Sequence, residues 1–365
     1  MSTTRSPALR EFGGNNVRPI IDGLKGNSGL IVIVAAFCAM AMVVQYILLG
    51  HQGSAILFSR QQLSSPFTFL TGTFVFGFFL LHPLYVMIFV RPERLTAYIV
   101  EDLRTRYLTA GRLTQGLTVL ILMQPFISAF SALKTLIPTV NPFYLDEYFM
   151  ELDRLLHGGM DPWVLLHPLL ASPFISSALN FSYNIWFFVL FGMLFWQAFS
   201  QKNQERRLQF FYAFLSLWIF LGIVAATLLS SAGPVYYGRV TGLADPYAPL
   251  MAYLHQANAL FPIWSLEVQD ILWSSYSLGT DVAGKGISAM PSLHVAVVTL
   301  FALVGWGENR WMGAIFTTFA LLILIGSVHL GWHYAVDGYV SIVLTGFIWW
   351  VAGKWVRRSK KSPLP

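Results

Sequence analysis

Long apolar segments alternate with short polar ones along the whole chain. A helix needs roughly 20 apolar residues to cross a bilayer. Eight segments reach or approach that length: 29–50, 67–90, 114–137, 176–199, 208–230, 292–306, 311–328 and 335–354. The sixth and seventh are short, so their ends are the least well defined. The pattern predicts an all-α fold, a polytopic helical membrane bundle with about eight transmembrane helices.

The composition supports this interpretation. The 365 residues are 56% hydrophobic and only 11% charged, whereas soluble domains are about 25% charged. The chain lacks the polar surface to cover a water-soluble globule, which excludes a disordered chain, a coiled coil and an ordinary cytosolic enzyme. The first apolar run follows 28 mostly polar residues and is too long for a cleavable signal peptide. The single cysteine, Cys38, excludes an internal disulfide and a cysteine-based metal site within one chain.

The basic residues predict how the bundle is oriented. If the eight segments all cross the membrane, 18 of the 23 lysines and arginines fall on one side and four on the other. Basic residues concentrate in cytoplasmic loops, so both termini are expected in the cytoplasm. This distribution is typical of topology signals and does not resemble a nucleic-acid-binding face. The one basic residue assigned to neither side, Lys134, lies within the third predicted span.

The predicted spans divide the chain into four regions and place two long loops on the outer face. The regions are a cytoplasmic N-terminal tail, 1–28; two extra N-terminal transmembrane helices with a basic cytoplasmic loop, 29–113; a six-helix core, 114–354; and a basic cytoplasmic tail, 355–365. The outer loops are 138–175 and 231–291. In the first, acids interleave with apolar residues between Phe143 and Leu156, which predicts an amphipathic interfacial helix. A second short helix is expected from Pro162 to Leu170. Both helices are also interpretable as a lid or as packing without chemistry.

Candidate chemistry gathers where the last three spans meet the outer face. Pro291-Ser292-Leu293-His294 opens the sixth span. Proline favours a helix start, and the free N–H groups of a first turn attract phosphate. Ser292 is therefore a candidate phosphate-binding residue, and His294 lies in the same turn.

A second group joins the seventh and eighth spans. His333 and Asp337 are four residues apart and can touch on a helix, where the carboxylate would orient the imidazole. His329 lies four residues before His333, but Gly331 between them makes a shared face doubtful. His294, His333 and Asp337 together suit phosphoryl transfer through a phosphohistidine, a scheme that requires no metal or other cofactor. Two alternatives remain open: solvated or capping histidines, and a metal site built from these three residues and His329.

These residues resemble the type 2 phosphatidic acid phosphatase superfamily, specifically its inositol phosphorylceramide synthase-like branch. Pro291-Ser292-Leu293-His294 is similar to the second motif, with the leucine variant of that branch, and His333 with Asp337 is similar to the third. The resemblance covers about residues 114–354. It implies that His333 is the nucleophile, Asp337 its partner and His294 the acid/base residue, at the outward end of a helical membrane bundle.

The sequence also departs from the phosphatase members of this superfamily. Their first motif, Lys followed by Arg-Pro, has no counterpart, and Ser327 stands where the third motif usually has arginine. The place of the first motif reads Pro234-Val235-Tyr236-Tyr237, which resembles the synthase branch. Fewer cations favour a phosphodiester, which carries one charge less than a phosphate monoester. The candidate phosphate- and substrate-binding residues are Ser292, Lys285, Arg239, Tyr236, Tyr237 and His329.

The sequence thus predicts a lipid phosphotransferase that passes a phospho-headgroup to a lipid or glycolipid hydroxyl. An alternative is a lipid phosphate or polyprenyl pyrophosphate phosphatase using the same site. More remote alternatives are a transporter with proton-relay histidines and a non-catalytic scaffold. The expected partners are membrane lipids as donor and acceptor, with no nucleic acid. The expected location is a bacterial inner membrane or a eukaryotic endomembrane, with the site on the periplasmic or lumenal face.

Overall fold

The computed structural model describes residues 17–50, 66–278 and 286–361, and every regular element in these ranges is helical. This confirms the all-α fold class. Seven helical segments in the described ranges are long and apolar enough to cross a membrane. They are α2 (Ser28–Leu49), α4 (Pro66–Tyr85) with η3 (Val86–Val90), α6 (Ala110–Val140), α9 (Pro173–Phe199), α10 (Gln204–Ser216) with η5 (Leu217–Ala225) and α11 (Ala226–Leu228), α16 (Arg310–His329) and α17 (Ala335–Lys361).

The sixth predicted span forms a shorter helix than the others. It is α15 (Leu293–Glu308), an apolar helix of 16 residues. At 1.5 Å per residue it is about 24 Å long, less than the roughly 30 Å of a hydrocarbon core. Its start lies inside the protein, because Ser292 and Val295 are fully buried. Because α15 begins inside the protein, a site at its first residues lies within the bundle and not at its surface.

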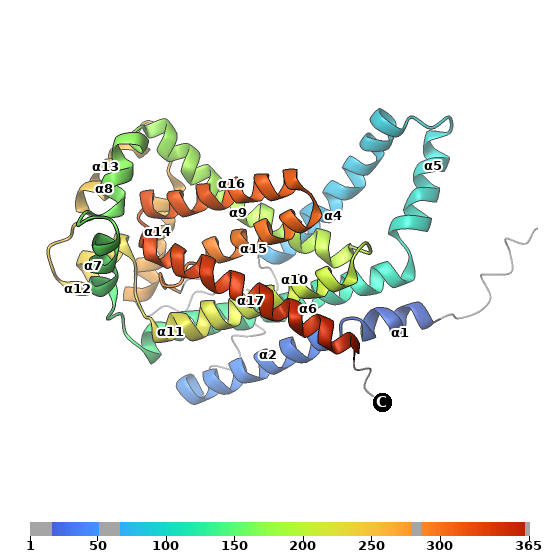
Figure 1. Ribbon diagram of the computed structural model, residues 1–365, viewed down its shortest axis with the longest axis horizontal. Helices are drawn as coiled ribbons and strands as arrows, with labels where there is room; N and C mark the ends of the chain where they lie inside the picture. Colours follow the sequence, from blue (N-terminus) through green and yellow to red (C-terminus); the bar gives the residue numbers. More distant parts are fainter. Residues whose placement is uncertain (1–16, 51–65, 279–285, 362–365) are drawn as a thin grey trace, which may run out of the picture.

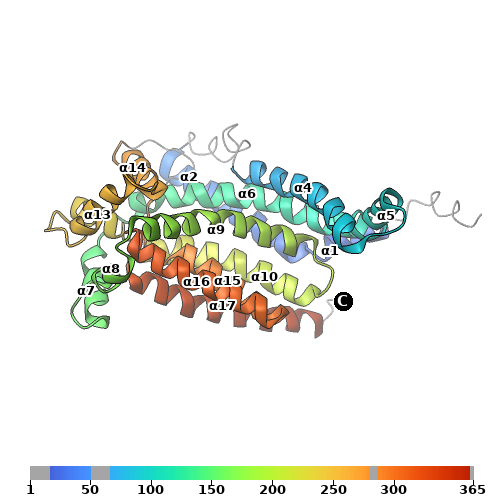
Figure 2. The ribbon, with the colours of Figure 1, turned by 90° about the horizontal axis from the view of Figure 1, so that it is seen from above.

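Helix α15 lies at the centre of the bundle. It packs against α9, α10, η5, α16 and α17, and the side chains from Val295 to Val298 are fully buried. The two N-terminal apolar helices lie outside this group, with α2 against α6 and α4 against α9 (Figure 2). This arrangement agrees with an integral membrane protein, whose lipid-facing helices bury only part of their surface.

Short helices cover one end of the bundle (Figure 1). They are α7 (Asp146–Leu156), α8 (Pro162–Leu170), α12 (Tyr237–Thr241), α13 (Ala248–Asn258) and α14 (Trp264–Ser277). The predicted helix from Pro162 to Leu170 is confirmed at both ends. Helices α12 to α14 lie within 231–291, which is predicted from the sequence only as a long loop. They are short, and the apolar pattern of short helices is weak.

The opposite end of the bundle carries α1 (Arg18–Lys25), α5 (Leu95–Asp102) and the C-terminal end of α17 (Figures 1 and 2). The predicted cytoplasmic loops are therefore on one side and the predicted outer loops on the other. The alternation of spans explains this separation, because each crossing exchanges the ends of the bundle.

Candidate active site

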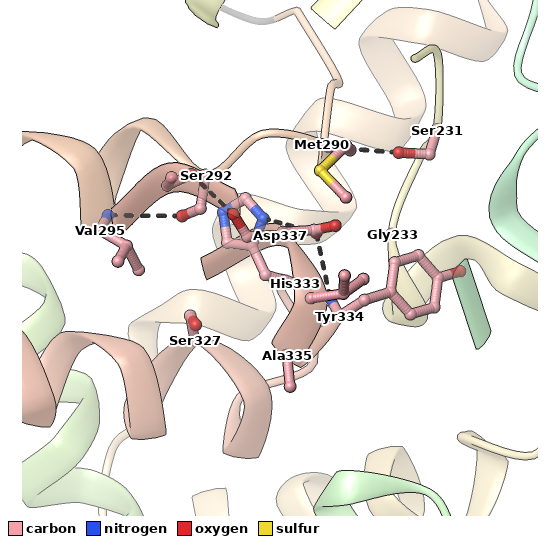
Figure 3. A network of polar contacts seen from close by, with 12 residues as sticks. Ser231, Gly233, Met290, Ser292, Val295, Ser327, His333, Tyr334, Ala335 and Asp337 are labelled. Atoms are coloured by element: carbon pink, nitrogen blue, oxygen red, sulfur yellow. Dashed lines mark hydrogen bonds and ion pairs between the residues drawn. The ribbon is translucent and has the colours of Figure 1, made fainter. Parts of the chain in front are cut away.

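His333 and Asp337 form a direct pair at the junction of α16 and α17. The distance from His333 Nδ1 to Asp337 Oδ2 is 3.1 Å, and the N–H of Tyr334 donates to the same oxygen at 3.1 Å (Figure 3). Asp337 is fully buried and His333 is 7% exposed. A carboxylate at Nδ1 holds the proton on that nitrogen and leaves the Nε2 lone pair available for chemistry.

A glycine turn places His333 between the two helices. Gly331 follows the end of α16 with φ of +73°, a conformation that glycine adopts without steric cost. The N–H groups of Trp332 and His333 then donate to the carbonyl of Ser327 at 2.9 and 3.2 Å. This reversal separates His329 from His333, as the sequence suggested.

Burial controls the charge of His333. Burial lowers the pKa of His333 to about 3, and the positive charge of Lys134 adds to the effect. The imidazole is therefore neutral near pH 7. A histidine that attacks phosphorus must be neutral, because only the unprotonated nitrogen is nucleophilic.

His294 lies in the first turn of α15 between aromatic rings. Its ring centroid is 4.5 Å from that of Tyr183 and 4.3 Å from that of Trp186. The indole N–H of Trp186 donates to the His294 carbonyl at 3.1 Å. The centroids of His294 and His333 are 6.4 Å apart, so both rings are within reach of one phosphoryl group.

Both histidines line a cavity of about 570 Å³. This volume is within the range of small-molecule sites. Aromatic and aliphatic side chains form much of its wall, among them Phe130, Phe187, Leu190 and Trp218. Along α6 the lining runs from Lys134 back to Gln124, a rise of about 15 Å. The cavity therefore extends from the histidines into the apolar interior of the bundle.

Lys134 is a cavity residue that is not among the site residues predicted from the sequence. It lines the cavity together with His294 and His333. Its only signal in the sequence was a charge inside a predicted span, a feature that often marks function. Its position beside the histidines depends on packing between α6 and the segment that precedes α15.

Helix α7 holds two loops of the site through buried carboxylates. Asp146 accepts hydrogen bonds from the N–H groups of Ala232 and Gly233 at 2.9 and 2.8 Å. It also accepts one from the Tyr334 hydroxyl at 2.9 Å. Burial raises the pKa of Asp146, against the opposing effect of these hydrogen bonds. The carboxylate thus ties the loop after α11 to the segment that carries His333.

Asp153 performs a similar task two turns later on the same helix. It accepts hydrogen bonds from the N–H groups of Ala335 and Val336 at 2.7 and 2.9 Å. Asp146 and Asp153 are 2% and 1% exposed, so these two acids do not face water as in an ordinary amphipathic helix. Their spacing of seven residues, which puts both on one helix face, was the signal available in the sequence.

The remaining candidate residues have different surroundings. Ser292 caps α15, because its Oγ accepts the N–H of Val295 at 3.4 Å. Tyr236 lines the cavity and donates its hydroxyl to the Gln269 carbonyl at 2.9 Å. Tyr237 is buried, with its ring centroid 5.8 Å from that of Tyr247. Of these three, Tyr236 alone is among the cavity-lining residues.

Arg239, His329 and Lys285 are the last three candidates from the sequence. The guanidinium of Arg239 lies over the Trp273 ring at 5.1 Å, and Arg239 does not line the cavity. His329 is fully buried and its Nε2 lies 2.8 Å from Ser176 Oγ, away from the lining residues. Lys285 lies outside the described residues.

The four residues of the alternative metal site, His294, His329, His333 and Asp337, do not form a metal-binding group in the structure. Within residues 17–50, 66–278 and 286–361, no group of three or more His, Cys, Asp or Glu side chains is arranged to hold a metal ion. His329 Nε2 lies 2.8 Å from Ser176 Oγ instead, and the other three residues do not form such a group either.

Comparison with known families extends this description. The family model described as PAP2 superfamily matches residues 147–351, more than half of the chain. The chain belongs to the PAP2 superfamily. Searches against curated proteins and solved structures return no significant match. Membership supports a lipid enzyme of the phosphatase or phosphotransferase type. The match contains His294, His333 and Asp337, whereas Lys134 lies before its first residue.

Proposed function

We propose that this chain is a membrane-embedded lipid phosphotransferase of the inositol phosphorylceramide synthase-like type. It moves a phospho-headgroup from a phospholipid to a hydroxyl of a lipid or glycolipid. The observation that carries the proposal is one cavity that both histidines line, with His333 paired to the buried Asp337. The apolar wall suits a lipid chain, and the histidines suit its phosphate.

In the first half-reaction, His333 Nε2 attacks phosphorus and the bond from phosphorus to the lipid alkoxide oxygen breaks. His294 gives its proton to the departing oxygen, so a neutral lipid alcohol leaves. The phospho-headgroup stays on His333 as a phosphohistidine. The negative charge of the bound phosphate favours the protonated form of His294. Asp337 stabilises the positive charge that develops on the attacking imidazole.

In the second half-reaction, the acceptor hydroxyl loses its proton to His294 and attacks the same phosphorus. The phosphorus–nitrogen bond breaks, which returns His333 to its neutral form and restores the proton on His294. After one cycle both histidines have therefore returned to their starting protonation states, and the phospho-headgroup has moved from donor to acceptor. In this proposal the apolar wall of the cavity favours a lipid hydroxyl over water, the competing acceptor.

The proposed orientation places this site away from the cytoplasm. The basic loops lie at the end opposite to α7, α8, α13 and α14, and such loops are usually cytoplasmic. The site would then face the periplasm of a bacterial inner membrane or the lumen of an endomembrane. Donor and acceptor would reach it from the surrounding bilayer.

The experiment uses the purified full chain in nanodiscs with a panel of labelled phospholipids. Reactions run with and without a lipid extract as acceptor, and mass spectrometry identifies the products. We expect a new lipid carrying the transferred phospho-headgroup, which depends on the acceptor and is absent with His333→Ala. His255→Ala is the matched control, because His255 is an exposed histidine on α13 and its loss should leave activity unchanged.

Two results would contradict the transferase proposal. Release of inorganic phosphate from lipid monophosphates or polyprenyl pyrophosphate, without any transferred product, would assign the phosphatase alternative. Equal activity of His333→Ala and the wild type would remove the phosphohistidine from the mechanism.

A further inference from the structure

Lys134 is a membrane-embedded cation without a partner in the described part of the chain. It lies in the last three turns of α6 (Ala110–Val140), and no ion pair or hydrogen bond of its ammonium group is present among the described residues. A charge within a membrane segment is costly unless something compensates it. An uncompensated ammonium group that faces a cavity therefore indicates an anionic ligand.

The position of Lys134 is set by the segment that leads to His294. An added Cβ at Gly286 would lie 2.6 Å from the Lys134 carbonyl oxygen and 2.8 Å from its Cγ. Gly286 therefore packs directly against Lys134, and both residues line the cavity. Lys134 is near enough to both histidines for its charge to act on each. The cation and the two histidines therefore surround the same part of the cavity.

The charge of the cavity wall is small. In the described wall Lys134 is the one lysine or arginine, and no aspartate or glutamate lines it. One positive charge compensates a phosphodiester, which carries a single negative charge. A phosphate monoester dianion would leave a second negative charge in an apolar enclosure, at a considerable desolvation cost.

We propose that Lys134 binds the phosphate group of the substrate and that this group is a singly charged phosphodiester. The inference rests on the proposed function, because it places the bound phosphate beside His294 and His333. It assigns the cation of the site to α6, which precedes the region of the family match. The ammonium group provides a charged hydrogen bond to a non-bridging phosphate oxygen.

Binding of two soluble probes to the purified full chain tests this proposal without requiring turnover. Dihexyl phosphate is a diester with one negative charge, and trihexyl phosphate is its uncharged counterpart. Isothermal titration measures affinity, and ligand-induced thermal stabilisation provides a second reading. We expect Lys134→Met to weaken dihexyl phosphate binding by about tenfold or more, which is typical for loss of a charged hydrogen bond.

The controls separate a binding role from a structural one. Lys134→Arg keeps the charge and should keep most of the affinity for dihexyl phosphate. Binding of trihexyl phosphate should be the same in the wild type and Lys134→Met. Lys202→Met is the matched control, because Lys202 is an exposed lysine at the opposite end of the bundle. Without ligand, Lys134→Met should be at least as stable as the wild type, since an unpaired cation has left an apolar site.

The outcomes also separate this inference from the proposed reaction. Unchanged dihexyl phosphate affinity in Lys134→Met overturns the inference, whatever the enzyme does with lipids. His333→Ala should lose turnover and keep the lysine-dependent binding. If the wild type transfers no headgroup but binding still depends on Lys134, the proposed reaction fails while the phosphate site stands. Tighter binding of hexyl phosphate, a monoester dianion, than of dihexyl phosphate overturns the assignment of a diester.

Discussion

Asp153 on α7 caps α17, a helix that begins 182 residues later in the chain. Its Oδ2 accepts the N–H of Ala335, the first residue of α17, at 2.7 Å. This contact fixes the start of the helix that carries Asp337. Because His333 lies two residues before that helix, the position of the nucleophile depends on a carboxylate from α7. The short helices at this end of the bundle therefore contribute to the geometry of the site.

Asp153→Asn should lower turnover. The amide has one acceptor oxygen for the two N–H groups that the carboxylate binds, and a displaced His333 should lower kcat more than it raises KM. Steady-state kinetics of the purified variant measure this effect, and thermal unfolding shows whether the variant is folded. Glu151→Gln, an exposed position on the same helix, is the matched control. An unchanged kcat in Asp153→Asn would show that the cap does not position the nucleophile.

The same residue predicts a pH dependence of stability. Burial raises the pKa of Asp153 to about 6 from an ordinary value of 3.8, so the folded chain holds this proton more tightly than the unfolded chain. The resulting stabilisation is fully present below pH 3.8 and is lost as the pH rises through about 6. The wild type should therefore gain stability relative to Asp153→Asn between pH 7.5 and 5, by about 1.4 kcal/mol. Equal changes in the two proteins would contradict the prediction.

Asp337→Asn should reduce turnover by about 10²-fold or more while the protein remains folded. The amide cannot stabilise the imidazolium, and it no longer fixes the proton on His333 Nδ1. Rates with a labelled lipid donor, together with size-exclusion profiles, measure this effect. Asp270→Asn, at an exposed position on α14, should behave as the wild type. Full activity of Asp337→Asn would remove the carboxylate from the mechanism.

Gly222→Val should restrict the apolar part of the cavity. A Cβ at Gly222 would lie 2.6 Å from Phe130 Cε2 and 2.7 Å from Leu293 Cδ1, and all three residues line the cavity. Overpacking of this size lowers stability by about 1 to 3 kcal/mol. The added side chain also takes up cavity space, so KM for a long-chain lipid should rise by about tenfold. Gly346→Val is the control, because an added Cβ there meets nothing within 4 Å. An unchanged KM would show that lipid chains do not occupy this part of the cavity.

Cysteine labelling should establish which face carries the site. In a Cys38→Ala background, Leu155→Cys on α7 is 77% exposed and should react with an impermeant maleimide in intact cells. Lys202→Cys, where the native side chain is 82% exposed at the other end, should react only after permeabilisation. The opposite pattern would invert the orientation derived from the basic loops.

Much of the bundle could be predicted from the sequence because a bilayer constrains a chain locally. Each apolar run must satisfy its backbone hydrogen bonds internally, so length and hydropathy suffice to identify it as a helix. The limits of 29–50 and 335–354 agree with α2 and α17 to within a residue at the start of each. The run 292–306 was also correctly predicted as a helix, although its length falls short of a full span.

The short helices could not be predicted with the same success. Helices α12, α13 and α14 contain few turns, and their stability comes from packing on one end of the bundle. Tyr236, for example, donates to Gln269, 33 residues later in the chain. Local pattern does not encode such pairings, so the sequence leaves this region as a loop.

For the site, the sequence by itself determined the local chemistry: the spacing of His333 and Asp337, the helix start before His294, and the membrane setting. These features depend on neighbours within one or two helical turns. Tertiary structure alone decided that Lys134 lines the same cavity as the histidines, that Asp146 and Asp153 are buried, and that His329 and Arg239 do not line the cavity. Each of these positions depends on contacts between segments far apart in the chain, whose energies come from burial and complementary packing.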